Sequence, residues 1–202
     1  MTPRQAYREK VKHIAERKFE PGKIVLLGDC VMEHIDIAHF FPGYTMYNNA
    51  IKHDTTITLK ETLHKRAIKY KPAKLFVSIG SNDLAFESFS VKEVYHNIID
   101  IIETIQKRSK STEIYLVTTL PVHPALNWDN LSDMTERIDN FDVSMLNYYL
   151  KNYARRNNIH IVDAHRHLKN EFDQLCSDYT IDGFHLNQAG YERYAGLIRK
   201  YV

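Results

Sequence analysis

The stretch Leu75-Phe76-Val77-Ser78-Ile79, followed directly by Gly80-Ser81-Asn82-Asp83, decides the fold that we expect. Its first part is almost continuously apolar, whereas a strand with one face in water alternates apolar and polar residues. Continuous apolar runs are typical of strands that are buried on both faces of a parallel sheet covered by helices. Ile114-Tyr115-Leu116-Val117 is a second run of this kind. Together the two runs predict a parallel sheet inside an α/β domain.

Apolar runs and helical patterns alternate along the rest of the chain. Strands are predicted at Lys23–Leu27, Tyr44–Tyr47, Lys74–Ile79, Glu113–Thr118 and Asn158–Val162. Helices are predicted to begin at Thr2-Pro3, at Thr55 or Thr56 and at Ser90, and to span Asp139–Asn157 and Gln188–Tyr201. The start at Ser90 is marked by a capping box, in which a serine and a glutamate three residues later satisfy each other's backbone amides. This alternation predicts a right-handed α/β sandwich.

Length and composition place limits on the class of protein. A chain of 202 residues is expected to form one domain spanning residues 1–202. The formal net charge of +2 gives no reason to expect nucleic acid or an anionic membrane as a partner. No apolar run has the length of a membrane span, and the first residues lack the apolar core of a signal peptide, so we expect a cytoplasmic protein. The cysteines and histidines show no metal-ligand spacing, so we expect no metal and no cofactor.

A candidate nucleophile follows the first predicted strand. Gly28-Asp29-Cys30 comes directly after Lys23–Leu27, at the expected start of a helix. Backbone amides and the positive end of a helix stabilise an anion, so the pKa of the thiol is expected to fall from about 8.5 towards neutrality. The alternative is that Cys30 is a small buried apolar side chain, which is the usual state of a free cysteine.

Two further segments carry groups suited to acyl chemistry. Asp182 and His185 are three residues apart, so the carboxylate can hold one ring nitrogen while the other acts as a general base. Gly80 permits a tight turn, and the side-chain amide of Asn82 could donate to a developing oxyanion. The alternative for Gly80-Ser81-Asn82-Asp83 is an ordinary turn.

The longest irregular stretch runs from Pro121 to about Arg137 and contains His123, Trp128, Asp129 and Asp133. Since it follows a strand at the edge where α/β sheets bind ligands, it is either a substrate-binding loop or a surface excursion. His165 and His167 are interpreted as solvated polar residues.

The order and spacing of these segments resemble the SGNH/GDSL hydrolase family. The first block of that family, Gly-Asp-Ser, is similar to Gly28-Asp29-Cys30 with the nucleophile changed. The third block, Gly-x-Asn-Asp, matches Gly80-Ser81-Asn82-Asp83, and the fifth, Asp-Gly-x-His, matches Asp182-Gly183-Phe184-His185. The resemblance implies a flavodoxin-like three-layer α/β/α sandwich around a mostly parallel five-stranded sheet. It also implies hydrolysis of carboxylic esters, with Cys30, His185 and Asp182 as the catalytic triad.

The second block departs from the family pattern. Where the family has Asn-x-Gly-Ile-x-Gly-Asp-Thr-Thr, this chain has Asn48-Asn49-Ala50-Ile51-Lys52-His53-Asp54-Thr55-Thr56. His53 therefore replaces a glycine whose backbone N–H donates to the oxyanion, and it places a β-carbon there. The resemblance implies that the amides of Cys30 and His53 and the side chain of Asn82 form the oxyanion hole, with Asp29 and Gly80 in the same loops. Loss of one donor of this kind costs about 100- to 1,000-fold in rate.

Two functions remain open at this stage. The first is a working hydrolase of a small-molecule ester in which Cys30 attacks the acyl carbonyl, with thioester hydrolysis or acyl transfer as variants. The second is a protein that has kept the fold to bind an acyl or sugar ligand and turns it over poorly. The cysteine could also be an engineered replacement for serine.

Overall fold

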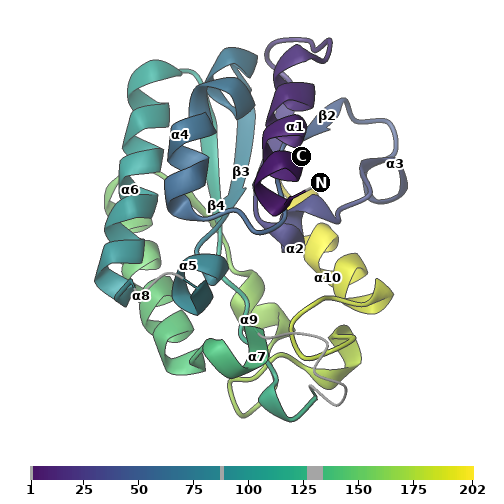
Figure 1. Ribbon diagram of the computed structural model, residues 1–202, viewed down its shortest axis with the longest axis vertical. Helices are drawn as coiled ribbons and strands as arrows, with labels where there is room; N and C mark the ends of the chain where they lie inside the picture. Colours follow the sequence, from purple (N-terminus) through teal and green to yellow (C-terminus); the bar gives the residue numbers. More distant parts are fainter. Residues whose placement is uncertain (1, 87–88, 127–133) are drawn as a thin grey trace.

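The computed structural model describes residues 2–86, 89–126 and 134–202, and these ranges contain a five-stranded sheet. Its strands are β1 (Ile24–Gly28), β2 (Met46–Asn48), β3 (Lys74–Ser78), β4 (Glu113–Val117) and β5 (His160–Val162). The strand order is β2-β1-β3-β4-β5, and each neighbouring pair is parallel (Figure 1). The predicted parallel sheet is confirmed, with strand ends that shift by one or two residues.

Helices cover both faces of this sheet. One face carries α1 (Pro3–Glu16), α4 (Thr56–Arg66), α6 (Val91–Arg108) and α8 (Asn140–Arg156). The other carries α2 (Cys30–Glu33), α3 (Ile37–Phe40), α9 (Ala164–Leu168) and α10 (Gln188–Arg199). Two short helices, α5 (Ser81–Phe86) and α7 (Met134–Arg137), and the turns Ile68–Tyr70, Pro124–Leu126 and Ser177–Tyr179 complete the elements. The three-layer α/β/α sandwich is confirmed.

The inner positions of the central strands are mainly apolar because each side of the sheet has its own core. Val25 and Leu27 pack under α1 and α4, while Leu26 between them packs towards α2 and α10. In β3, Leu75 and Val77 belong to the core under α1 and α4, whereas Phe76 belongs to the core on the other face of the sheet. Successive side chains of a strand point to opposite faces, so most positions of a doubly covered strand favour an apolar residue.

The predicted helix starts are confirmed by their caps. Thr2 accepts from the amide of Gln5, and Ser90 accepts from the amide of Glu93, each in a complete capping box. Thr55 caps α4 in the same way, which decides between the two threonines considered from the sequence. These helices begin where a hydroxyl satisfies backbone amides that have no partner inside the helix.

One interpretation from the sequence is wrong. His165 is 6% exposed, and its amide donates to the hydroxyl of Thr118 at 2.9 Å. Helix α9 begins directly after β5 and packs onto the sheet, so its first turn lies in the interior. Burial lowers the pKa of His165 to about 4.

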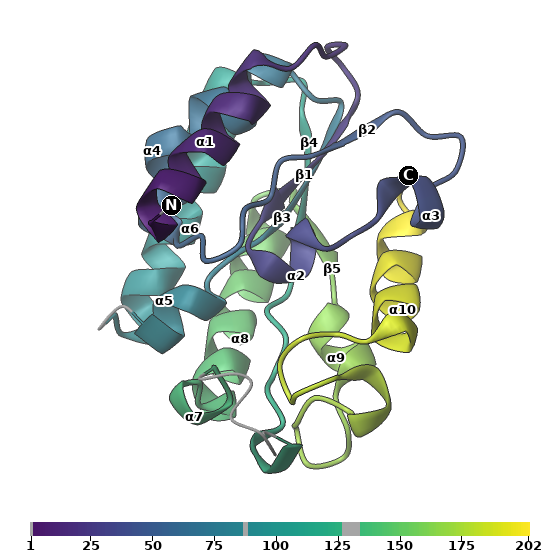
Figure 2. The same cartoon turned by 45° about the vertical axis from the view of Figure 1, so that its right-hand side comes forward.

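The strand order fixes where a site can form. The chain moves outward from β1 to β2 and then returns to place β3 on the other side of β1. Ligands of open α/β sheets bind at such a switch point, outside the carboxyl ends of the strands. Here β1 and β3 are followed by Asp29-Cys30 and Ser81-Asn82-Asp83, where the short helices α2 and α5 begin. Figure 2 shows α5, α7 and α9 at this same edge.

Gly28 allows β1 to end close to its neighbour. A β-carbon at this position would lie 2.0 Å from the carbonyl oxygen of Ser78, which is backbone and cannot move aside cheaply. Glycine is therefore required at the residue that leads into Asp29-Cys30.

None of the helices in residues 2–86, 89–126 and 134–202 combines the length and apolar content needed to cross a bilayer.

Candidate active site

Cys30 is the first residue of α2, directly after β1. Asp29 caps this helix through its side chain, which accepts from the amide of Val31 at 3.2 Å. The thiol is 5% exposed, and burial, reinforced by the nearby carboxylate of Asp29, raises its pKa above the ordinary value. The expectation of a lowered pKa is wrong. Helix α2 has only four residues, and the desolvation of the thiol outweighs the stabilisation that the positive end of this helix gives to a thiolate. The thiol is protonated at neutral pH.

Asp182 and His185 form a tight pair. Nδ1 of His185 lies 2.6 Å from Oδ2 of Asp182, while Oδ1 accepts from the amides of Phe184 and His185 at 3.0 and 2.7 Å. Burial opposes ionisation of Asp182, but these hydrogen bonds outweigh it and hold its pKa below the ordinary value. The His185 side chain is 39% exposed, and in the described residues no hydrogen bond engages its Nε2. Asp182 is thus placed to orient His185 as a general base.

Gly183 makes this loop possible. Its φ of +87° lies in the region that favours glycine, and a β-carbon there would meet the carbonyl oxygen of His123 at 2.3 Å. Its amide donates to the hydroxyl of Thr180 at 2.9 Å.

His53 adopts a left-handed backbone conformation, with φ of +61°. The glycine of the family pattern would take this conformation without strain, whereas the β-carbon of histidine costs about 1 kcal/mol or more. In the described ranges no residue accepts a hydrogen bond from the His53 amide, so that donor stays available. Burial and the nearby charge of Lys52 lower the pKa of the His53 imidazole, and the carboxylate of Glu33 opposes them.

We expect His53→Gly to raise the free energy of unfolding by about 1 kcal/mol, because glycine removes the left-handed strain. The amide remains, so ester hydrolysis should change only a few-fold. Urea unfolding and initial rates measure the two effects. Lys71→Gly is a matched control, since Lys71 also has a positive φ, of +44°, away from the site. Loss of stability in His53→Gly alongside a gain in Lys71→Gly would show that the His53 side chain stabilises the fold.

The three loops at this edge are joined by side-chain hydrogen bonds. The amide of Asn82 donates to the carbonyl of Asp54 at 2.8 Å. The hydroxyl of Ser81 donates to Asp29, and the carboxylate of Asp83 accepts from the amide of Thr56 at 3.0 Å. One N–H of Asn82 is therefore used in anchoring the His53 loop, and the second is the one that an oxyanion would need.

Gly80 precedes these residues with φ of +122°. A β-carbon there would lie 3.2 Å from the side chain of Val94, so glycine also allows close packing against α6.

Asp29 is a buried carboxyl group whose pKa burial raises to about 6. A raised folded-state pKa means that the folded protein binds this proton more tightly than the unfolded chain does. Its contribution to stability is therefore present at low pH and is lost as the pH rises from about 4 to about 6.

We predict that Asp29→Asn gains stability relative to the parent across that window, by on the order of 3 kcal/mol at pH 7, since one pKa unit is worth about 1.4 kcal/mol. The asparagine can still accept from Val31 and pair with Ser81. Unfolding free energies of both proteins between pH 4 and 7 give the difference, with exposed Asp178→Asn as the control. A difference that does not vary with pH would contradict the assignment.

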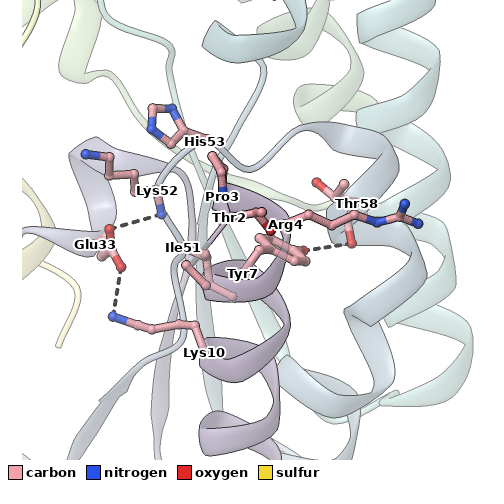
Figure 3. A pocket seen from close by; sticks show the side chains of 11 residues that line it. Thr2, Pro3, Arg4, Tyr7, Lys10, Glu33, Ile51, Lys52, His53 and Thr58 are labelled. Carbon is pink, nitrogen blue, oxygen red and sulfur yellow. Dashed lines mark hydrogen bonds and ion pairs between the residues drawn. The ribbon is translucent and has the colours of Figure 1, made fainter.

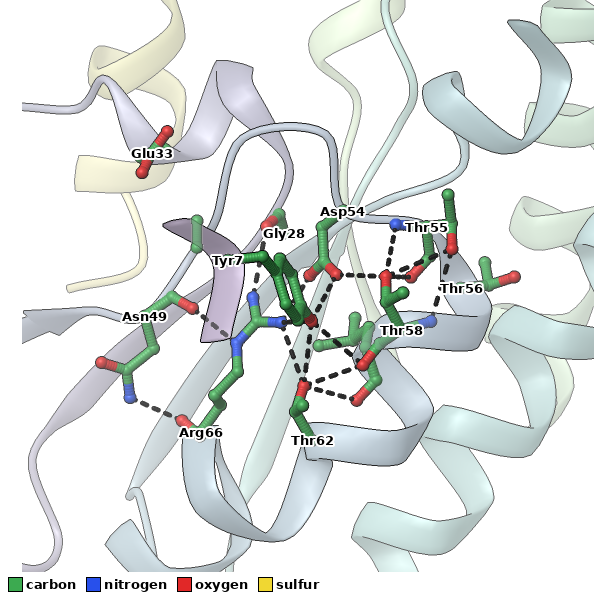
Figure 4. Close-up of polar contacts among 12 residues, drawn as sticks. Tyr7, Gly28, Glu33, Asn49, Asp54, Thr55, Thr56, Thr58, Thr62 and Arg66 are labelled. Carbon is green, nitrogen blue, oxygen red and sulfur yellow. Dashed lines mark hydrogen bonds and ion pairs between the residues drawn. The ribbon is translucent and has the colours of Figure 1, made fainter. Parts of the chain in front are cut away.

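A buried arginine next to the site was not anticipated from the sequence. Arg66 is 0% exposed, and its Nη1 lies 2.5 Å from Oδ2 of Asp54 (Figure 4). Its Nε donates to the carbonyl of Asn49 at 2.9 Å and its Nη2 to that of Gly28 at 3.5 Å. The hydroxyl of Thr58 donates to Oδ1 of Asp54 at 2.7 Å. Arg66 thereby ties together the ends of β1 and β2, from which Cys30 and His53 extend.

The remaining candidates are placed as follows. Cys30, at the start of α2, and His185, in the loop before α10, follow strands of the same sheet, but in the described part of the chain no hydrogen bond joins the thiol to the imidazole. Trp128, Asp129 and Asp133 lie outside the described residues, and the flanking parts of Pro121–Arg137 form helical turns. Within the described ranges, no three His, Cys, Asp or Glu side chains are grouped as metal ligands would be.

Comparison with solved structures shows the same fold in other proteins. A protein from Streptococcus pneumonia, named as a candidate platelet activating factor, is 25% identical, with a TM-score of 0.85 over 98% of this chain and 91% of that one. A GDSL-like lipase from Bacteroides thetaiotaomicron is 20% identical, with a TM-score of 0.81 over 96% of each chain. A catalytic mutant of an acetylxylan esterase from Geobacillus stearothermophilus is 15% identical, with a TM-score of 0.66 over 91% of this chain and 95% of that one.

Comparison of sequences adds the family. The chain is 27% identical over 120 residues to an N-acylneuraminate cytidylyltransferase from Escherichia coli O18:K1:H7; these residues are 58% of this chain and 25% of that protein. The chain thus spans about a quarter of the length of this curated relative. The model of the GDSL-like lipase/acylhydrolase family matches residues 35–193, which include His53, Asn82, Asp182 and His185. On that match, which covers most of its length, the chain belongs to the GDSL-like lipase/acylhydrolase family.

Proposed function

We propose that this protein hydrolyses carboxylic esters of small molecules with Cys30 as the nucleophile, His185 as the general base and Asp182 as the residue that orients it. The observation that carries this proposal is the contact of 2.6 Å between His185 and the buried carboxylate of Asp182, at the carboxyl edge of the sheet. A protein that only binds a ligand has no need of a base held in this way. Membership of an acylhydrolase family supports the same reaction class.

In the proposed reaction, Sγ of Cys30 attacks the carbonyl carbon of the ester while its proton passes to Nε2 of His185. Because burial raises the pKa of the thiol, this proton leaves during the attack and not beforehand. The oxyanion accepts from the amides of Cys30 and His53 and from Asn82. The imidazolium then protonates the leaving alcohol as the C–O bond breaks, which leaves an acyl thioester on Cys30. Water, deprotonated by His185, hydrolyses this thioester and releases the acid.

The test compares three proteins: the chain with Cys30, Cys30→Ser and Cys30→Ala. Each is assayed with short-chain 4-nitrophenyl esters and a matched thioester. We expect turnover by the Cys30 protein and none by Cys30→Ala. If only Cys30→Ser is active, the base and the oxyanion donors work, and cysteine is the defect. If all three are inactive, the proposal fails.

The second candidate function is binding of an acyl or sugar ligand with little turnover. The raised pKa of Cys30 and the strained backbone at His53 favour it, since both depart from a site shaped for rapid catalysis. Rapid hydrolysis of any simple ester by the Cys30 protein would exclude it.

A further inference from the structure

A cavity of about 590 Å³ opens beside the site, between α1 and the loop that follows β2. Its lining includes His53, the proposed oxyanion donor, and Glu33, the last residue of the helix that begins with Cys30. Figure 3 shows His53 at one side of this cavity. The volume is in the range of small-molecule sites. Cys30 itself does not line the cavity, and His53 and Glu33 are the residues that connect it to the proposed site.

The lining of this cavity is positively charged. It carries the side chains of Arg4, Lys10 and Lys52 against the single carboxylate of Glu33. Glu33 is fully engaged, because Oε1 pairs with Lys10 at 2.8 Å and Oε2 accepts from the amide of Lys52 at 3.0 Å.

Two of these cations are left without an acidic partner. In the described part of the chain, no carboxylate pairs with the side chain of Arg4 or Lys52. In Figure 3 the two side chains extend in opposite directions, Lys52 on the side of Glu33 and Arg4 on the side of Thr58, and both are long enough to turn towards a bound anion. The hydroxyl of Tyr7 bonds to Asp54, whose charge Arg66 matches, so the buried carboxylate below does not offset them.

The rest of the wall is mostly apolar. It is formed by Pro3, Ala6, Ile51 and the ring of Tyr7, together with the polar side chains of Thr2, Thr58 and His53. A suitable ligand therefore has a short apolar stem with a negative charge on it. We propose that the cavity binds an anionic group of the ester substrate, a carboxylate or a phosphate, and that Arg4 and Lys52 recognise its charge. This inference rests on the proposed function, since it assigns the substrate class of that site.

Kinetics with matched esters test the preference. The charge can be on the acyl side or on the alcohol side. The 4-nitrophenyl monoester of glutaric acid is compared with 4-nitrophenyl butyrate for the first. The butyryl ester of glycerol 3-phosphate is compared with that of glycerol for the second. We expect one anionic ester to be preferred, and Arg4→Gln or Lys52→Gln to reduce that preference about 10-fold. Lys107→Gln, an exposed change on α6, should leave it unaltered. Equal rates for anionic and neutral esters would overturn the inference.

A binding measurement separates this inference from the proposed reaction. Hexanoate and hexyl phosphate are titrated into Cys30→Ala, with hexanol as the neutral probe, and the backbone amide signals of residues 51–53 are followed by NMR. Saturable shifts with an anion, weakened by Lys52→Gln and by added salt, would support the cavity site even if no ester is hydrolysed. Absence of shifts with both anions, or equal shifts with hexanol, would overturn it.

Discussion

Replacement of Arg66 by methionine is expected to lower the free energy of unfolding by about 3 to 5 kcal/mol, the usual cost of breaking a buried ion pair on one side. The guanidinium is 0% exposed and lies 2.5 Å from Asp54, whose side chain is also 0% exposed. Methionine fills much of the space but leaves the carboxylate buried without its cation. The carbonyls of Asn49 and Gly28 lose a donor at the same time. Urea unfolding of the two proteins at pH 7 measures the difference.

A double-mutant cycle separates the ion pair from the packing. Arg66→Met combined with Asp54→Asn should be less destabilised than the sum of the single variants, because no unpaired charge remains. The exposed pair Lys60–Asp100, at 2.6 Å, provides the control. Lys60→Met should cost about 1 kcal/mol or less, since exposed ion pairs contribute little. If Arg66→Met costs no more than Lys60→Met, the buried network does not stabilise the fold.

Replacement of His185 by alanine is expected to lower kcat/KM for an ester by about 10⁴-fold or more, as removal of the base from a triad does. Asp182→Asn should lower it by about 10⁴-fold, because an amide cannot hold Nδ1 of His185 in the protonated tautomer. The carboxylate contacts Nδ1 and two backbone amides, so the asparagine variant also reports on the loop. Initial rates and urea unfolding of each variant distinguish lost catalysis from lost structure.

His64→Ala serves as the matched control, since His64 is an exposed histidine on α4. It should retain the parent rate. If His185→Ala retains that rate as well, His185 is not the base and the proposed triad is wrong. If Asp182→Asn loses activity only in proportion to its loss of folded protein, Asp182 has a structural role alone.

The sheet was predictable because its signal is local. The residues of Leu75–Ile79 and Ile114–Val117 that belong to either core are all apolar. A continuous apolar run of this kind therefore indicates a strand that is covered by helices on both faces. The caps at Thr2 and Ser90 are local as well, because each involves residues three apart. Asp29-Cys30 and Ser81-Asn82-Asp83 could be expected at one edge for a similar reason, because they follow parallel strands and these end at the same edge.

What the sequence could not predict depends on contacts between distant segments. The pKa of Cys30 is raised because the thiol is buried in a core that also includes residues of α10, such as Tyr194, far along the chain. Arg66 occupies the last turn of α4 among His64 and Lys65, where a solvated cation is the ordinary expectation. Only the three-dimensional fold shows that Asp54 and the carbonyls of Gly28 and Asn49 surround it. His165 was misjudged likewise, because its burial depends on how α9 packs.

The loop that holds Asp182 and His185 has a consequence for protein synthesis. It lies between β5 and α10, while Cys30 follows the first strand of the sheet. During translation β1, β2 and β3 can pair long before residue 185 has been added. A nascent chain arrested before that residue would therefore contain the proposed nucleophile and oxyanion loop without a base. Ester hydrolysis by ribosome-bound chains of increasing length should accordingly begin only once residue 185 has emerged and α10 has packed, so the proposed activity would report on the packing of α10.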